Sequence, residues 1–260
     1  KYDFSTNQTT QITYFTSGDI LKNPVVSEDG EKILFSLSDG GDYQLYWINS
    51  DGSGRENLSD TYNLNQVTKN QKYGALNSDK TLLAFTAESR DPNMPGGQQL
   101  WLKELTGQKR LYQLTFNDPV THSLWDCSYP VFIDNSHILF KVDDLNSTLQ
   151  DYYVVSTTGA ELINITNNFQ FSPYHPRLGR PSLNFDKTMI IYGEQKQTSS
   201  GYSDWEIYTR SVGGGAETKV LTGLYYEEDP EDQPDPMPVF VTTGQFIFRG
   251  EEQGTGERYL

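Results

Sequence analysis

Two segments of the sequence bring together side chains that are suited to binding a ligand. Their members are His122, Trp125, Asp126 and Tyr129 in the first, and Tyr174, His175, Arg177 and Arg180 in the second. Two guanidinium groups can hold a carboxylate through paired hydrogen bonds, and aromatic faces can stack on a sugar ring. These residues therefore predict a pocket for a sugar or an acidic group. A structural interpretation stays open beside it, in which the rings pack between sheets and the arginines pair with nearby acids.

A third segment is strongly acidic and runs from Glu227 to Asp235. Calcium binds several carboxylate oxygens, so calcium is the one cofactor that the sequence suggests. The spacing is not that of an EF-hand, and the prolines at 230, 234 and 236 favour an extended, solvated loop instead. Asp235 is a further ligand-binding candidate. If Asp126 and Asp235 converge, they supply the facing carboxylates that a glycoside hydrolase needs.

The sequence contains no recognisable catalytic or metal-binding motif. Cys127 is the single cysteine, which excludes an internal disulfide and every multi-cysteine metal site. The three histidines do not stand in the His-x-x-x-His or His-Glu-x-x-His spacing of zinc hydrolases, and no Gly-x-Ser-x-Gly motif occurs. We therefore assign no catalytic residues, expect no cofactor apart from the calcium considered above, and leave the metal content open.

Composition narrows the choice of partners. The chain has 35 acidic and 20 basic residues, which gives a formal net charge of −15. Nucleic acids and anionic membranes both attract basic surfaces, so neither is expected as a partner. No apolar run approaches the roughly 20 residues of a membrane-spanning helix, so no membrane insertion is expected.

The chain repeats one pattern five times. Each repeat begins with a short strand, continues through a polar turn such as Asp29-Gly30 or Asp186-Lys187, and closes an apolar run on an aromatic residue. The closing aromatics are 50, 55, 52 and 56 residues apart. The run does not alternate between apolar and polar residues, which is typical of a strand buried on both faces. The repeats are anchored near Pro24, Gly74, Pro130, Pro181 and Pro238.

Two further strands follow each closing aromatic, so each repeat holds four strands. Four-stranded units at this period predict an all-β fold, the β-propeller, in which each repeat forms one blade. Residues 1–16 match the back half of a repeat, and residues 238–260 match the front half. The simplest interpretation is one domain over residues 1–260, with five blades and a ring closed by the N- and C-terminal segments. A six-bladed ring, or a piece cut from a larger ring, is the alternative.

The repeat resembles the WD40-like repeat of TolB propellers. The resemblance is carried by residues 23–35, NPVVSEDGEKILF, followed by LYWINSDG at 45–52 and ENLS at 56–59. It touches every repeat, and it implies a propeller fold and a periplasmic or secreted setting in the bacterial cell envelope. The same repeat occurs in propeller domains of peptidases and in oligogalacturonate lyases, so the resemblance implies no particular activity. No functional residue of the family matches by motif.

Function is expected where the loops that lead into the innermost strands meet, at the mouth of the central channel. The first hypothesis is a non-catalytic binding or scaffold propeller, acting as a monomer or as a domain of a larger protein. It recognises a protein or a carbohydrate at this mouth. The second is a carbohydrate-active enzyme, a polysaccharide lyase or glycoside hydrolase, with its site at the same mouth.

Overall fold

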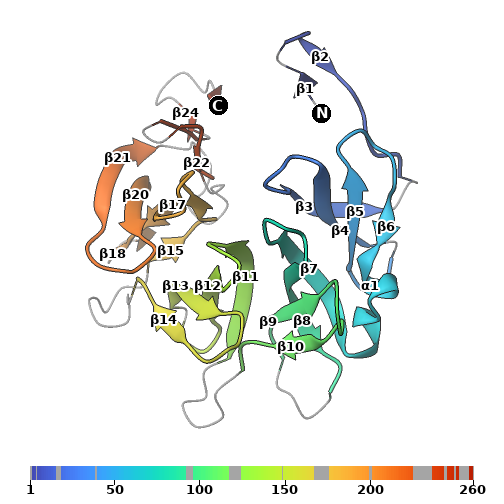
Figure 1. The fold of residues 1–260 in the computed structure, drawn as a ribbon. Helices are drawn as coiled ribbons and strands as arrows, with labels where there is room; N and C mark the ends of the chain where they lie inside the picture. Colours follow the sequence, from blue (N-terminus) through green and yellow to red (C-terminus); the bar gives the residue numbers. More distant parts are fainter. Residues whose placement is uncertain are drawn as a thin grey trace. The chain divides into compact units, whose positions relative to one another are not determined.

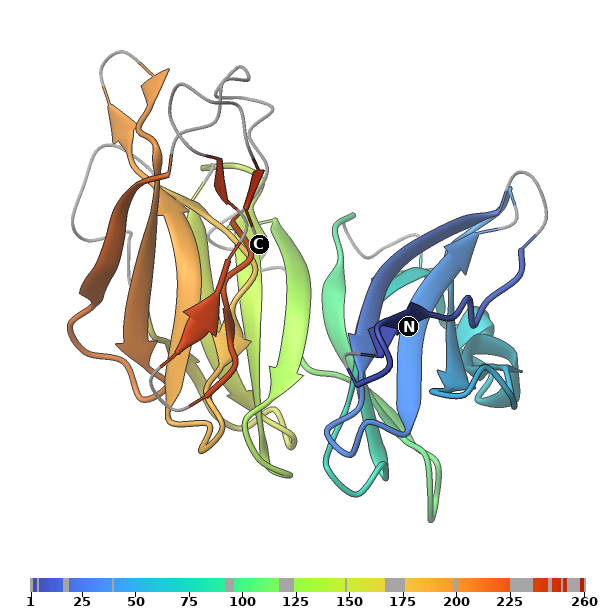
Figure 2. The same ribbon diagram turned by 90° about the horizontal axis from the view of Figure 1, so that it is seen from above.

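The computed structural model describes most of the chain. The described residues are 2–3, 5–15, 19–38, 40–91, 96–116, 124–147, 149–166, 176–198, 201–224, 236–242, 245–248, 250–251 and 258–259. They form two compact units, Lys1–Gln113 and Leu114–Leu260. In each unit the chain builds two larger antiparallel sheets, and of these four sheets three have four strands and one has five (Figures 1 and 2).

The first unit holds two such sheets. One is built from β3 (Ile20–Val26), β4 (Lys32–Ser38), β5 (Gln44–Asn49) and β6 (Glu56–Asn57). The other is built from β7 (Thr68–Leu76), β8 (Leu82–Ser89), β9 (Gln99–Glu104) and β10 (Leu111–Gln113). A short helix α1 (Leu58–Thr61) and a 3-10 turn η1 (Leu64–Gln66) connect them. A hairpin of β1 (Tyr2–Asp3) and β2 (Gln8–Thr9) precedes them.

The second unit repeats the pattern. Its first sheet is β11 (Trp125–Phe132), β12 (His137–Asp144), β13 (Gln150–Ser156) and β14 (Leu162–Asn164). Its second sheet comprises β15 (Arg177–Leu178), β16 (Ser182–Leu183), β17 (Met189–Gln195), β20 (Trp205–Ser211) and β21 (Thr218–Leu224). Two-stranded pairs complete it: β18 (Gln197–Thr198) with β19 (Gly201–Tyr202), β22 (Val239–Phe240) with β23 (Phe246–Ile247), and β24 (Gly250–Glu251) with β25 (Arg258–Tyr259).

The second strand of each four-stranded repeat is buried on both faces, as its sequence predicts. Five consecutive residues are buried in each of β4, β8 and β12, and six are buried in β17. In the first unit Leu34 and Leu45 pack with Leu83 and Phe85 of the next sheet. In the second unit Tyr152 packs edge-on against Tyr192, with ring centroids 5.0 Å apart. Each sheet is therefore covered by a neighbour of the same kind.

The hairpin turns use the predicted chemistry. Gly30, Lys80 and Lys187 have positive φ angles of 74°, 58° and 57°. Asn and Asp side chains hold these turns, since Asp79 accepts a hydrogen bond from the Thr81 hydroxyl at 2.6 Å and Asp186 accepts one from Thr188 at 2.6 Å. Hydrogen bonds from nearby polar side chains therefore stabilise the hairpin turns that the sequence predicts.

A β-bulge interrupts the innermost strand directly before the anchor residue of several repeats. The strand register shifts between Lys22 and Val25, between Lys72 and Ala75, and between Ser128 and Val131. The residue before four of the five anchors has a left-handed backbone: Asn23, Tyr73, Tyr129 and Met237, with φ of 54°, 48°, 52° and 45°. Such a conformation costs free energy for a non-glycine residue, so each bulge is held by the surrounding sheet and re-aims its side chain.

The last strand of the first repeat is short. β6 ends at Asn57 and α1 begins at Leu58, so only the first half of the ENLS segment at 56–59 is a strand. The reason is local, because the Asn57 side chain accepts a hydrogen bond from the Asp60 N–H at 3.2 Å and so caps the helix. The two terminal half-repeats form their own hairpins. That they complete one fifth blade, and that residues 1–260 make one domain, stay predictions.

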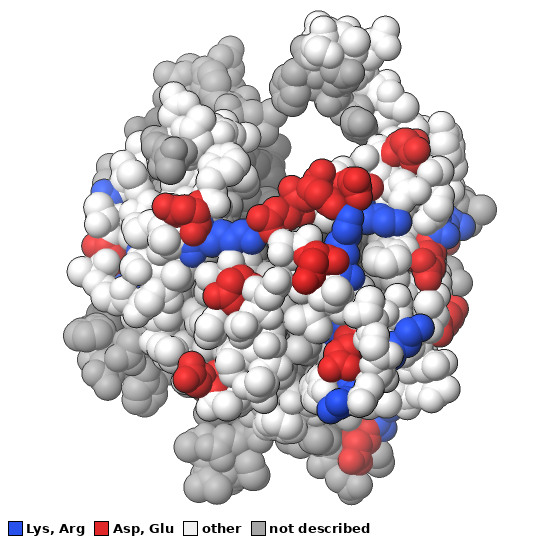
Figure 3. Space-filling view, viewed as in Figure 1, with Lys and Arg blue, Asp and Glu red and all other residues white. Residues whose placement is uncertain are grey.

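An ion pair joins the hairpin turns of the first unit. Lys80, at the β7–β8 turn, bonds Asp29 and lies 2.7 Å from Glu31, both at the β3–β4 turn. Red and blue side chains adjoin over this region in Figure 3. The Lys80 ammonium, with the Ser27 hydroxyl and the Glu31 N–H, holds the pKa of Asp29 well below its ordinary value.

Replacing Lys80 by glutamine should therefore raise the titration midpoint of the Asp29 carboxyl toward the ordinary value of aspartate. A depressed pKa stabilises the folded state above the ordinary value, and this gain is lost as the pH falls through the folded pKa. The wild-type protein should thus exceed the variant in stability near neutral pH, and the difference should vanish in acid. NMR titration of the aspartate carboxyl carbons measures the midpoint. Asp186 is the internal control, since Thr188 lowers its pKa; an unchanged Asp29 midpoint contradicts the prediction.

Candidate functional site

Five of the nine predicted ligand-binding residues lie in the described part of the second unit: Trp125, Asp126, Tyr129, Arg177 and Arg180. The other four, His122, Tyr174, His175 and Asp235, lie outside the described residues, as does the acidic segment 227–235 that suggested calcium. The role of all nine in ligand binding stays a prediction.

Trp125 lines a small pocket on one face of the β11–β14 sheet. It begins β11 opposite Asp144, and its ring lies 5.0 Å from that of Tyr153, tilted by 43°. The pocket has a volume of about 160 Å³ and is lined by Trp125, Val142, Asp144, Leu149, Asp151, Tyr153 and Asn164. We call it the acid–aromatic pocket. It combines two ring faces, two carboxylates and one amide at the end of the sheet where the chain enters β11.

Hydrogen bonds hold the polar wall of this pocket in place. The Asn164 amide donates to the Tyr153 hydroxyl at 3.1 Å and to Asp151 at 3.1 Å. The other Asp151 oxygen accepts from the Thr166 hydroxyl at 2.6 Å. Asp144 accepts from the Ser147 hydroxyl at 2.8 Å. The wall is therefore preorganised before any ligand arrives.

Part of this network belongs to the repeat and not to the pocket. In the first sheet Asn57 donates to the Tyr46 hydroxyl at 3.0 Å and to the Gln44 side chain at 2.7 Å, at the same 11-residue spacing from Asn to Tyr. Sequence reasoning missed Tyr153 as a site residue, although this repeated spacing was the available signal. The β11–β14 sheet differs by adding Trp125 and by replacing the neutral Gln44 with the carboxylate of Asp151.

The electrostatic potential in the acid–aromatic pocket is negative. Burial raises the pKa of the Tyr153 hydroxyl to about 12, and the charges of Asp151 and Asp144 add to the rise. A phenol so placed stays protonated at neutral pH. It is thus a hydrogen-bond donor as well as an acceptor.

Asp126 lies on the opposite face of the same sheet from Trp125, because consecutive strand residues point to opposite faces. It stands opposite Asp143, and Asp143 stands opposite Gln150, whose side chain accepts a hydrogen bond from the Leu178 N–H in β15. Burial raises the pKa of Asp143; the Lys141 ammonium at 3.2 Å opposes this rise, and the charge of Asp126 adds to it. Asp126 and Asp143 are thus a carboxylate pair on the face turned to β15.

Two of the remaining predicted residues contact each other. The Arg180 guanidinium lies 5.8 Å from the centre of the Tyr129 ring. Arg177 stands in β15 opposite Gln195 of β17. The structure therefore brings Tyr129 and Arg180 together, and that all nine residues form one pocket stays a prediction.

A buried glutamate on β17 is a second feature that sequence reasoning missed. Glu194 is 4% exposed and lies 3.9 Å from the Lys196 ammonium. Burial raises its pKa to about 7; the charges of Glu217 and Glu206 add to the rise, while Lys196 and Arg210 oppose it. No motif in the sequence marks this residue, because the effect arises from strands that are far apart in the chain.

Metal ligands do not gather in the parts of the chain that the structure describes. Within those parts no three His, Cys, Asp or Glu side chains are placed to hold an ion. Cys127 is buried, and its sulfur lies 3.5 Å from the Thr115 hydroxyl. His137 pairs with the exposed Asp134 at 3.0 Å.

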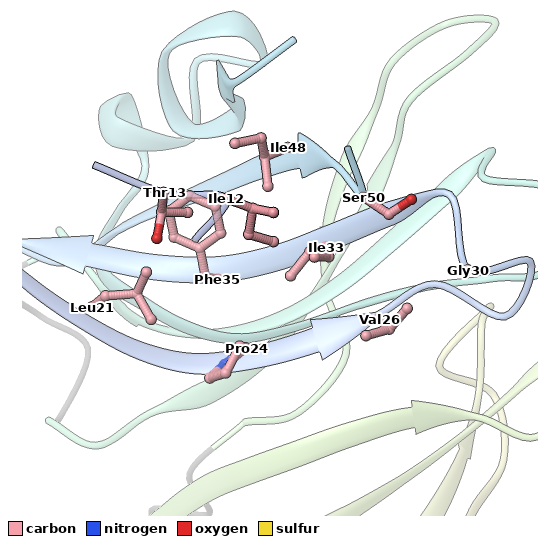
Figure 4. Close-up of a pocket in the computed structure, with 10 residues that line it drawn as sticks. All are labelled: Ile12, Thr13, Leu21, Pro24, Val26, Gly30, Ile33, Phe35, Ile48 and Ser50. Atoms are coloured by element: carbon pink, nitrogen blue, oxygen red, sulfur yellow. The ribbon is translucent and has the colours of Figure 1, made fainter. Parts of the chain in front are cut away.

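A larger pocket in the first unit is almost wholly apolar. It has a volume of about 410 Å³. It lies on the β3–β5 strands, where Phe35, Ile33 and Ile48 point toward Ile12 of the N-terminal segment (Figure 4). Leu21, Pro24 and Val26 of β3 complete its apolar wall. Since its lining carries no ionisable side chain, this pocket offers no acid–base chemistry.

Comparison with solved structures identifies the fold as a β-propeller. The chain is similar to TolB from Acinetobacter baumannii, with a TM-score of 0.64 and 17% identity over 97% of this chain and 53% of that one. It is also similar to an oligogalacturonate lyase in complex with manganese, with a TM-score of 0.56 and 12% identity over 99% of this chain and 80% of that one. The propeller domain of the Trilobed protease from Pyrococcus furiosus gives a TM-score of 0.54 and 11% identity over 93% and 66%.

These likenesses concern the fold alone, since sequence identity is low. No family model and no curated protein sequence matches the chain. The chain spans about half the length of the TolB structure that it matches. Among the residues with described structure, no helix is long and apolar enough to cross a membrane.

Replacing Glu194 by glutamine should make the protein less sensitive to pH. The pKa of Glu194 is about 7 in the folded protein and near 4.5 in the unfolded chain. Its protonated side chain therefore costs the folded state nothing below pH 4.5, but the folded state loses stability as the pH rises through about 7 and the buried carboxyl ionises. The variant should match the wild type near pH 4 and exceed it by about 3 kcal/mol above pH 8, at about 1.4 kcal/mol per pKa unit.

Urea unfolding at a series of pH values measures this difference. Glu161→Gln, a change at an exposed glutamate of the same unit, is the matched control and should follow the wild type. A constant difference between the Glu194 variant and the wild type across the pH range contradicts the assignment.

Proposed function

We propose that this chain is a non-catalytic binding propeller that recognises a carbohydrate through the acid–aromatic pocket. The observation that carries the proposal is the tilted pair of Trp125 and Tyr153 beside Asp144, Asp151 and Asn164. Ring faces accept the C–H side of a sugar, and carboxylates and amides pair with its hydroxyl groups. Small-ligand sites commonly combine aromatic walls with a few polar groups that fix the orientation of the ligand.

The size and rigidity of the pocket support this proposal. A volume of about 160 Å³ suits one ring and not a chain of them, so the pocket would hold a single residue of a glycan. Because Asp151 and Asn164 are already fixed by internal hydrogen bonds, a ligand orders few side chains on binding. Both carboxylates are acceptors, which favours the hydroxyl groups of a neutral sugar over an anion.

A carbohydrate-active enzyme is the second candidate, and the Asp126–Asp143 pair favours it. Two neighbouring carboxylates, one of them with a raised pKa, are the groups that a glycoside hydrolase uses as acid and base. In this alternative Asp143 gives the proton, and Asp126 is the second carboxylate of the pair. The fold is shared by an oligogalacturonate lyase, so the architecture is compatible with such chemistry.

We also propose a periplasmic or secreted setting. This rests on the resemblance to TolB, whose structure the chain matches over about half of that protein's length. A protein ligand is the remaining form of the binding hypothesis, in which the same aromatic residues contact a peptide surface.

The test begins with a panel of neutral and acidic oligosaccharides. Calorimetry should find binding to one or more of them, and Trp125→Ala should weaken that binding about tenfold or more, which corresponds to about 1.4 kcal/mol. Trp47→Ala is the matched control, since Trp47 is also half-buried but pairs with Glu56 in the first unit, outside the pocket. Equal losses in both variants would sink the proposed site.

Mass spectrometry of the same mixtures, with and without EDTA, separates the two candidates. Unchanged oligosaccharides support the binding propeller. New products that disappear in Asp143→Asn support the enzyme and overturn the non-catalytic proposal. Absence of both binding and products overturns both candidates and directs the search to a protein ligand.

A further inference from the structure

Tyr43 in the first unit is the meeting point of two lysines from neighbouring sheets. The ammonium nitrogen of Lys22, in β3, lies 5.4 Å from the centre of the Tyr43 ring, and that of Lys72, in β7, lies 5.5 Å from it. Tyr43 itself stands directly before β5. Ring faces attract cations at such distances, so the ring holds both side chains near one point.

The backbone around Tyr43 fixes this arrangement. The Gln71 N–H donates to the Tyr43 carbonyl at 2.9 Å, and the Tyr43 N–H donates to the side-chain oxygen of Asn70 at 3.4 Å. Each lysine comes directly before a residue with left-handed backbone, Asn23 or Tyr73, at the bulge of its strand. Strained positions that the fold maintains are common at binding sites.

The carboxylates near Tyr43 are engaged by other groups. Asp42 pairs with Arg90 at 2.8 Å. Glu88 lies 3.2 Å from Lys69 and accepts a hydrogen bond from the Asn70 amide at 2.9 Å. In the described part of the chain, no carboxylate lies within salt-bridge distance of Lys22 or Lys72. Lys22 and Lys72 thus bring two positive charges to one ring without an ion-pair partner among the described residues, in a chain whose net charge is −15; the charge of Glu88 acts on Lys72 from beyond salt-bridge distance.

Two other tyrosines each lie beside two lysines, and at one of them, Tyr208, an acidic side chain faces each ammonium group. At Tyr208 the lysines Lys196 and Lys219 lie 3.9 Å and 2.7 Å from Glu194 and Glu206. At Tyr62 one of the two, Lys103, is buried and donates to the Lys109 carbonyl, with the charge of Glu104 acting on it. The pair at Tyr43 thus differs from the pair at Tyr208, because within the described residues neither Lys22 nor Lys72 forms an ion pair.

We propose that Lys22 and Lys72, held beside Tyr43, form a binding site for an oxyanion, that is, a carboxylate or phosphate group of a small ligand. The two ammonium groups come from different sheets of one unit, so a bound anion would bridge β3 and β7. The positive field already extends to a neighbouring group: burial alone would raise the pKa of Glu88, yet the bonds from Asn70 and Lys69 and the charges of Lys69 and Lys72 lower it. This inference does not depend on the carbohydrate pocket, which lies in the second unit.

The experiment uses the whole chain with its lysines labelled by reductive 13C-methylation. Sodium phosphate and sodium acetate are titrated separately at pH 7, with sodium chloride keeping the ionic strength constant. Saturable NMR shifts are expected at Lys22 and Lys72 with at least one of the two anions. The better of the two anions identifies the preferred group, phosphate or carboxylate.

Variants locate the site. Lys22→Gln and Lys72→Gln should each weaken anion binding about tenfold, because each removes one of two attractive charges. Lys219→Gln is the matched control. Lys219 also lies beside a tyrosine ring, at 5.6 Å, but its charge is compensated by Glu206, so its removal should leave the affinity unchanged.

Shifts that never saturate, or that affect all lysines alike, overturn the proposal. So does an equal loss of affinity in the Lys219 variant. The titration of the wild-type protein decides the outcome even where a variant fails to fold. Trp125→Ala should leave anion binding intact, so failure of this site and failure of the carbohydrate pocket are told apart.

Discussion

Burial of one strand on both faces is the constraint on which this structure depends. Apolar side chains lie on both sides of four strands, β4, β8, β12 and β17. Neither face of these sheets is therefore exposed to solvent at its centre. Such a sheet is stable only when neighbours cover it, and Leu34 against Leu83 or Tyr152 against Tyr192 show how similar sheets do so. The backbone groups pair within each sheet, which leaves the strand ends and loops free to carry polar groups.

The repeat also separates structural polar groups from candidate functional ones. Networks that recur from sheet to sheet, such as Asn57 with Tyr46 and Asn164 with Tyr153, close the edge of a sheet and are part of the scaffold. Departures from the repeat are more informative. Trp125 beside Tyr153, and the two lysines at Tyr43 without an ion pair among the described residues, are the arrangements on which the two proposals rest.

The comparisons fit this division between scaffold and site. TolB, an oligogalacturonate lyase and a protease domain share the fold with the chain at 11–17% identity, so one architecture carries different activities. The propeller fold by itself therefore does not decide what such a protein binds. This is why the carbohydrate and anion proposals rest on side-chain geometry alone.

Much of the fold follows from the sequence by itself. The anchors near Pro24 and Pro130, the Asp-Gly turn at 29–30 and the runs that end on Phe35 and Phe140 are local signals, since turn chemistry and hydrophobic pattern act over a few residues. They identified the four-stranded repeat, and Trp125 as a candidate. The sequence did not reveal that Tyr153 packs beside Trp125, that Asp126 lies on the opposite face of the sheet from Trp125, or that Glu194 is buried. Only the tertiary structure decided these, and likewise the meeting of Lys22 and Lys72, because they depend on strand register and on contacts between segments far apart in the chain.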